Sequence, residues 1–244
     1  MKLRLIVGTM VAVTITSTAS LLAQDSHVRG PSLTFAKSLV GDRMMVKISN
    51  TSSHTVTAFL VIAKQFKADG RIAAEFHNYV DMFYNFHDSP LLSGESRVIE
   101  YGSSAALGHD DDVQLKAAVF DDGSTYGDKV WIDHILAKRE ILAQSLREIS
   151  AMCAAMRSSG APTRGAIVEQ FRHFEQDRNP LIPSIEEQMA VSQAAGNAIG
   201  LVTKSTVNGQ LYKEDQALDL VIEQFAAWQA RLATAALQSS QTTR

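Results

Sequence analysis

The sequence predicts an α+β protein in which the strands come first and the helices follow. Residues 32–127 are short apolar or alternating stretches separated by turns rich in Asn, Asp, Ser and Gly, which is the pattern of antiparallel strands. Residues 128–237 instead repeat apolar side chains at intervals of three and four, which is the spacing of amphipathic helices. With 244 residues and 45% hydrophobic content, the chain is long enough to bury a globular core.

The strands of the first half are expected from local patterns. Met44, Val46 and Ile48 alternate with Arg43, Met45 and Lys47, a period of two that indicates one buried face. Residues 55–63 are almost all apolar or β-branched, as in a central strand buried on both faces. Glycine-containing turns flank three further expected strands, at residues 72–79, 96–101 and 113–120. Six or seven such strands predict an antiparallel β-sandwich.

The second half begins with a long helix. Asp128 is its expected N-cap, and the helix is predicted to continue to Met156. One face of this helix carries six regularly spaced residues, namely Ile135, Leu142, Leu146, Ile149, Cys153 and Met156. Cys153, the only cysteine, is therefore predicted to be a small core residue, and an intramolecular disulfide is excluded.

Three more helices are expected beyond the long one. The first includes Ile167 to Phe174, and the second opens with a capping box formed by Ser184 and Glu187. The third follows the break at Asn208-Gly209 and presents its apolar face from Leu218 to Leu232. Gly196 and Gly200 predict close packing against a neighbouring helix, and the polar residues 238–244 predict a disordered tail.

The N-terminus has the three parts of a secretory signal peptide. Lys2 and Arg4 precede an apolar stretch, which is followed by small and hydroxyl residues. Cleavage is expected after Ala23, with cleavage after Ala19 as the alternative, and an uncleaved anchor is the competing interpretation. We therefore expect residues 1–23 to be removed. No later stretch reaches membrane-spanning length, so the sequence predicts a periplasmic or secreted protein without a membrane span.

Composition narrows the classes of partner and chemistry. The net charge is −3, with the charges interspersed and no basic patch, so nucleic acid is not an expected partner. The motifs GxGxxG, GxxxxGK[ST], GxSxG and HExxH do not occur. The sequence accordingly predicts no cofactor and no catalytic residue.

The turn chemistry of residues 48–127 resembles that of a known family. The order ISNTSSHTVTAFLVI, LLSGESRVIEYG and LKAAVFDDGSTYGD is similar to the immunoglobulin-like sandwich modules of exported bacterial proteins. The resemblance implies an immunoglobulin-like β-sandwich, which we expect to span residues 27–127. The apolar spacing of residues 128–237, rather than the resemblance, predicts the long helix and the helical region that follow. A helix begins after Gly127, where the family has a final strand. The last strand is therefore expected to be very short or covered by that helix.

The stretch EFHNYVDMFYNFHDSP, residues 75–90, is the best candidate for a site. His77, Asp81 and His87 are its candidate metal ligands. As a helix, the segment would place His77 and Asp81 four residues apart, at ligand spacing. As a strand, it would separate them by about 13 Å, which is too far for one ion.

The favoured interpretation of this stretch is architectural. We expect a strand to about Val80, followed by a loop whose aromatic side chains fold back. Phe76 and Val80 are expected on the sheet side, with some of Phe83, Tyr84 and Phe86 buried beneath the loop. No metal site is predicted on this interpretation.

These features favour an exported, non-catalytic binding or structural protein of the cell envelope. Its partner would be a protein or another envelope component. The alternative is an enzyme or enzyme accessory whose site lies between the sandwich and the helices.

Overall fold

The structure is a computed structural model that describes residues 33–40, 43–67, 69–84, 89–103, 112–160, 162–182 and 184–241. Its strands are β1 (Leu33–Val40), β2 (Arg43–Asn50), β3 (Val56–Phe66), β4 (Ile72–Asp81), β5 (Ser96–Ser103), β6 (Asp112–Phe120), β7 (Thr125–Gly127), β8 (Thr206–Val207) and β9 (Gln210–Leu211). Its helices are α1 (Lys129–Ser158), α2 (Arg164–Arg178), the 3₁₀ turn η1 (Asn179–Leu181), α3 (Ile185–Lys204) and α4 (Glu214–Gln241). The signal-peptide prediction and His87 lie outside the described residues.

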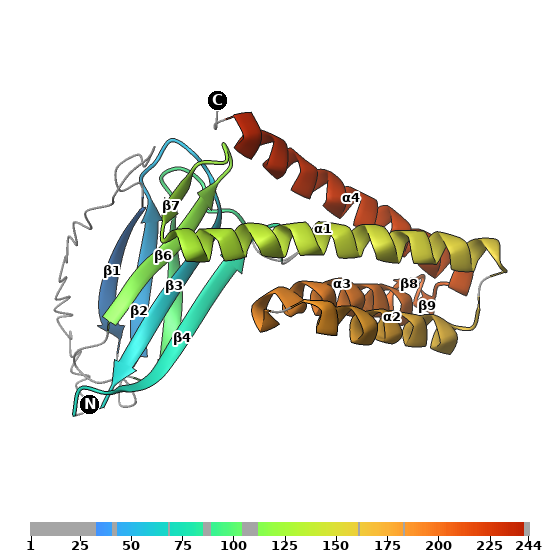
Figure 1. Ribbon diagram of the computed structural model, residues 1–244, viewed down its shortest axis with the longest axis horizontal. Helices are drawn as coiled ribbons and strands as arrows, with labels where there is room; N and C mark the ends of the chain where they lie inside the picture. The colour runs from blue at the N-terminus through green and yellow to red at the C-terminus, as the bar shows by residue number, and fades with distance from the viewer. Residues whose placement is uncertain are drawn as a thin grey trace, which may run out of the picture. The chain divides into compact units, whose positions relative to one another are not determined.

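Within the described residues, the first seven strands form two antiparallel sheets (Figure 1). One has the order β1-β2-β5, and the other has the order β4-β3-β6-β7. In β2, Val46 and Ile48 are buried while Lys47 is exposed, which confirms the predicted period of two. Every residue of β3 from Val56 to Ala63 is buried. The α+β class and the central position of β3 are therefore confirmed.

The chain changes from strand to helix at Gly127. This residue pairs with Ala117 of β6 and has a φ of +105°. A Cβ atom there would lie 2.2 Å from the carbonyl oxygen of Lys116, so a side chain would clash with the backbone. Asp128 then caps α1 by accepting a hydrogen bond from the Val130 amide at 2.9 Å. The expected N-cap is confirmed, and β7, with three residues, is as short as expected.

Two compact units divide the described residues. The first unit comprises residues to Thr55, Val61–Asn78 and Leu91–Leu115, and the second comprises Val56–Leu60, Tyr79–Pro90 and residues from Lys116 onward. The core of the first unit contains apolar residues of β1, β2, β3 and β5 together with Leu91 and Val113. Strands β3, β4 and β6 each contribute residues to both units.

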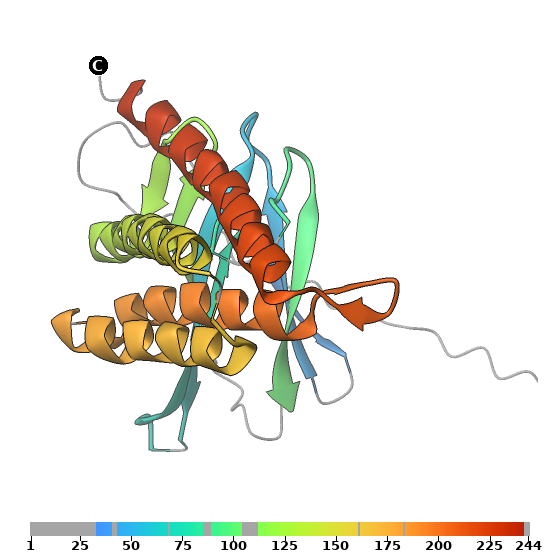
Figure 2. The ribbon, with the colours of Figure 1, turned by 90° about the vertical axis from the view of Figure 1, so that its right-hand side faces the viewer.

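The core of the second unit lies among the helices. α1 contacts α3 and α4, and α2 runs beside α3 (Figure 2). The largest fully buried side chains of these helices are Ile135, Leu142, Leu146, Ile149, Ile167, Phe171, Leu218, Phe225 and Trp228. The predicted apolar faces of α1 and α4 are thus confirmed. Among the described residues, no helix is both long and apolar enough to cross a bilayer.

Three details of the helical half differ from expectation. A Cβ atom on Gly196 or Gly200 would meet no atom within 4 Å, so the prediction of close packing at these glycines is wrong. The buried small residues of α3 are instead Ala190, Ala194, Ala195 and Ala198. α4 extends to Gln241, past the residue at which the tail was expected to begin. Asn208-Gly209, expected only as a break, turns the β8–β9 hairpin, with φ of 52° and 76°.

Candidate functional site

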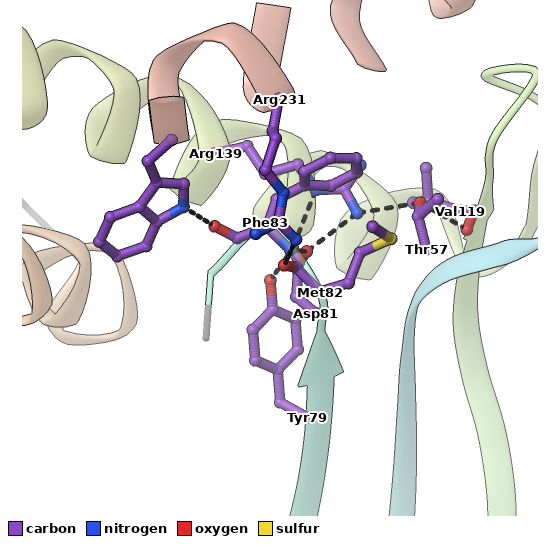
Figure 3. Close-up of polar contacts among 9 residues, drawn as sticks. Thr57, Tyr79, Asp81, Met82, Phe83, Val119, Arg139 and Arg231 are labelled. Carbon is purple, nitrogen blue, oxygen red and sulfur yellow. Dashed lines mark hydrogen bonds and ion pairs between the residues drawn. The ribbon is translucent and has the colours of Figure 1, made fainter. Parts of the chain in front are cut away.

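The most deeply buried charge in the described residues is the carboxylate of Asp81, at the end of β4. The residue is 0% exposed and belongs to the second unit. Its Oδ1 accepts hydrogen bonds from the Phe83 amide at 2.9 Å and from Arg139 Nη2 at 3.1 Å. Its Oδ2 accepts from Arg139 Nε at 2.8 Å and from the Tyr79 hydroxyl at 2.7 Å (Figure 3). Arg139 therefore forms a two-point ion pair with Asp81.

Arg139, on α1, also extends this network to β3 and β6. Its Nη2 donates to the Thr57 hydroxyl at 3.1 Å, and that hydroxyl donates to the Val119 carbonyl at 3.0 Å. The guanidinium carbon lies 4.6 Å from the centre of the Phe83 ring, over its face. One arginine thus joins β3, β4 and α1 within the second unit, and Thr57 carries the connection on to β6 (Figure 3).

This arrangement stabilises a charge that would otherwise be costly to bury. An ionised carboxylate has about four lone-pair directions for hydrogen bonds. The four donors from Phe83, Tyr79 and Arg139 use that capacity. A buried ion pair compensates for its loss of hydration only when its remaining hydrogen bonds are made. Because the Asp81 oxygens are already occupied by N–H and O–H donors, the carboxylate has no lone pair left for a metal ion.

Two tyrosines and a lysine lie next to the ion pair. The Tyr79 and Tyr84 rings meet edge to face, 5.9 Å between centroids. Lys138 Nζ lies 4.2 Å from the Tyr79 centroid and 5.3 Å from that of Tyr84. Burial, and then the negative charge of Asp81, raises the pKa of Tyr79 well above 10.0 and that of Tyr84 to about 12. Both hydroxyls therefore stay protonated at neutral pH, so Tyr79 acts as a hydrogen-bond donor.

The backbone after Asp81 is held by α4. Trp228 Nε1 donates to the carbonyl oxygen of Phe83, and Arg231 Nη2 donates to that of Met82 at 3.1 Å. Trp228 itself is 1% exposed and meets Phe225 edge to face. These contacts satisfy carbonyl groups that a buried turn would otherwise leave unpaired. The segment from Tyr79 to Tyr84 is thus an integral part of the helical core.

The structure separates the candidate residues of the aromatic stretch. His77 is exposed on β4, with its Nε2 2.7 Å from Glu75 Oε1, whereas Asp81 is buried with Arg139. Phe83 and Tyr84 are buried, as expected. The expectation that Phe76 lies on the sheet side is wrong, because its side chain is 44% exposed. Phe86, like His87, lies outside the described residues.

Sequence reasoning missed Arg139, Thr57 and Trp228 as partners of this segment. A signal for Arg139 was present. It lies four residues after Ile135 and three before Leu142, which places a charge on the apolar face of a helix. A charge at such a position requires a buried partner. The partner, Asp81, is 58 residues away, and no local pattern identifies it.

Cys153 is buried in the helical core, as the sequence predicts. Burial raises the pKa of its thiol from 9.0 to about 12. Because the thiolate is the reactive form, we expect slow reaction with a thiol reagent in the native protein and fast reaction after unfolding in urea. Equal rates would show that the thiol is accessible.

The same shift has a consequence for stability at high pH. The pKa of the Cys153 thiol is higher in the folded protein than in the unfolded chain. Its contribution to the free energy of unfolding is therefore fully present below pH 9.0 and falls as the pH rises from 9.0 toward 12.

Comparison of the chain with protein-family models, with curated proteins and with solved structures finds no match.

Proposed function

We propose that the protein is an exported, non-catalytic binding or structural protein of the cell envelope. The proposal that the protein is non-catalytic is supported by the hydrogen bonds that the Asp81 carboxylate accepts. Its carboxylate is held by four donors inside the protein. A catalytic carboxylate, by contrast, must be able to reach a substrate.

The raised pKa values of three buried side chains support the same proposal. General acids and bases work best with a pKa near the operating pH. The pKa values of Tyr84, Tyr101 and Cys153 are raised to about 12, chiefly by burial. These shifts move each group away from neutral pH, as expected of side chains that serve packing.

An immunoglobulin-like sandwich is the fold we propose for the strands. The orders β1-β2-β5 and β4-β3-β6-β7 correspond to A-B-E and C′-C-F-G in immunoglobulin domains. The turn sequences of residues 48–127 support the same assignment. Domains of this architecture commonly present loops and strand edges to protein partners, and we propose a protein or envelope component as the partner here.

The proposal of export is based on the signal-peptide pattern at the N-terminus. Intact-mass measurement after fractionation of the native host tests it. We expect the protein in the periplasmic or secreted fraction, with a mass that lacks residues 1–23. Replacing Lys2 and Arg4 by Glu should retain the full-length chain in the cytoplasm, because the positive n-region is lost. The matched control makes the same change to Glu at Lys204 and Lys213, which lie outside the signal-peptide pattern. It should leave export unchanged. An unprocessed wild-type chain in the cytoplasm would contradict the proposal.

A further inference from the structure

β4 has an outer edge that faces no other described strand. It stands at the end of the order β4-β3-β6-β7 and, with 10 residues, is the longest edge strand of the three described sheets. Residues Ile72 to Asn78 of β4 belong to the first unit. In this segment Ile72, Glu75, Phe76 and His77 are exposed. A long edge with exposed apolar side chains offers backbone N–H and C=O groups for pairing with another strand.

Glu75 and His77 flank Phe76 in β4, one on each side in the sequence. Glu75 and His77 lie on one face of β4, and their side chains are in contact, 2.7 Å between Oε1 and Nε2. Phe76 lies between them in sequence and on the other face. In an antiparallel pair, side chains directly opposite each other lie on the same face. A twofold pair of β4 strands must therefore place one residue opposite its own copy.

Of the three twofold registers centred on Glu75, Phe76 or His77, only the one centred on Phe76 places an acidic side chain opposite an imidazole. It places each Glu75 opposite His77 of the other copy, so two carboxylate–imidazole pairs form, and it places the two Phe76 rings side by side. A register centred on Glu75 opposes two carboxylates, and one centred on His77 opposes two imidazoles. Opposite-charge and aromatic cross-strand pairs stabilise a sheet, whereas like charges destabilise it.

We propose that two copies of the chain associate through the outer edges of their β4 strands, antiparallel and centred on Phe76. The interface joins two four-stranded sheets into one continuous sheet. This association is independent of the proposed function, since it depends on Glu75, Phe76 and His77 alone.

The test is sedimentation equilibrium of the chain as purified from its native host. We expect a dimer whose Kd lies roughly between 1 µM and 1 mM, the range of weak interfaces. Glu75→Lys should raise Kd about tenfold or more, because both cross-strand pairs lose their attraction. His77→Glu should do the same, because it opposes two carboxylates at each pair.

Mixing the two variants provides the sharpest measurement. In a heterodimer, the lysine introduced at position 75 of one chain faces the glutamate introduced at position 77 of the other. The unchanged His77 of the first chain faces the unchanged Glu75 of the second, so attraction returns to both pairs. We expect the mixture to associate about tenfold more tightly than either variant alone. A variant that had simply failed to fold would not be rescued by mixing.

The matched control is Val98→Lys, at an exposed residue of the edge strand β5. It introduces a charge on the other sheet and should leave Kd unchanged.

Three results would overturn the proposal. The first is a wild-type chain that stays monomeric across this concentration range, which would leave the β4 edge to a different partner or to solvent. The second is a dimer that neither variant weakens, or that mixing fails to restore. The third is a dimer that Val98→Lys weakens as much as the β4 variants do, which would place the interface on the other sheet.

Discussion

Asp81→Asn is expected to lower the free energy of unfolding by about 3–5 kcal/mol, the cost of breaking a buried ion pair on one side. The substitution leaves the guanidinium of Arg139 buried without a countercharge. It also places an amide NH2 group among the donors of Tyr79, Phe83 and Arg139. Urea unfolding of the whole chain at neutral pH measures the loss.

His77→Gln is the matched control, because His77 is the other described candidate ligand and its side chain is exposed. We expect the free energy of unfolding of the monomer to change by no more than about 0.5 kcal/mol, the usual range for an exposed residue. A chelator should leave the wild-type protein and both variants unchanged. If chelator lowered the stability of the wild type and His77→Gln reproduced that loss, the stretch would hold a metal and its architectural interpretation would be wrong.

Trp228→Ala is expected to cost about 3–5 kcal/mol, as for other buried aromatic side chains that leave a cavity. Trp228 is among the largest fully buried side chains of the described residues. Its loss also removes the hydrogen bond to the carbonyl of Phe83. Thermal or urea unfolding monitored by circular dichroism gives the difference.

Two further substitutions serve as comparisons for Trp228→Ala: one separates packing from hydrogen bonding, and the other alters an exposed aromatic residue. Trp228→Phe keeps an aromatic ring but leaves the Phe83 carbonyl without its donor. The unsatisfied carbonyl should account for about 1–3 kcal/mol of the decrease in the free energy of unfolding. Phe76→Ala removes an exposed aromatic ring and should change the stability of the monomer by no more than about 0.5 kcal/mol. Equal losses for Trp228→Ala and Phe76→Ala would contradict the assigned burial.

The elements that were predicted correctly are those specified by short-range patterns. The alternation in β2, the continuous apolar run of β3 and the N-caps Asp128 and Ser184 each depend on residues a few positions apart. The predicted face of α1 was correct for the same reason. Such signals reflect local backbone and burial preferences, which act before any tertiary contact is known.

The failures depend on tertiary context. Phe76 was expected to be buried because it is apolar. The first residues of β4 are mostly exposed, however, and only its last residue, Asp81, is buried. Gly196 and Gly200 were expected in a helix contact, but alanines on another face of α3 supply it. At the candidate site, the aromatic residues after Asp81 could be predicted to fold back. The partner that neutralises Asp81 could not, because Arg139 lies 58 residues away.

The central claim is that the carboxylate of Asp81 has an architectural role through its pairing with Arg139. A double-mutant cycle with Asp81→Asn and Arg139→Gln measures that pairing directly. We predict that the double variant loses at least about 2 kcal/mol less stability than the sum of the two single losses, because each single variant leaves a buried partner uncompensated. Additive losses, within about 0.5 kcal/mol, would show that the two residues act independently and would contradict this account.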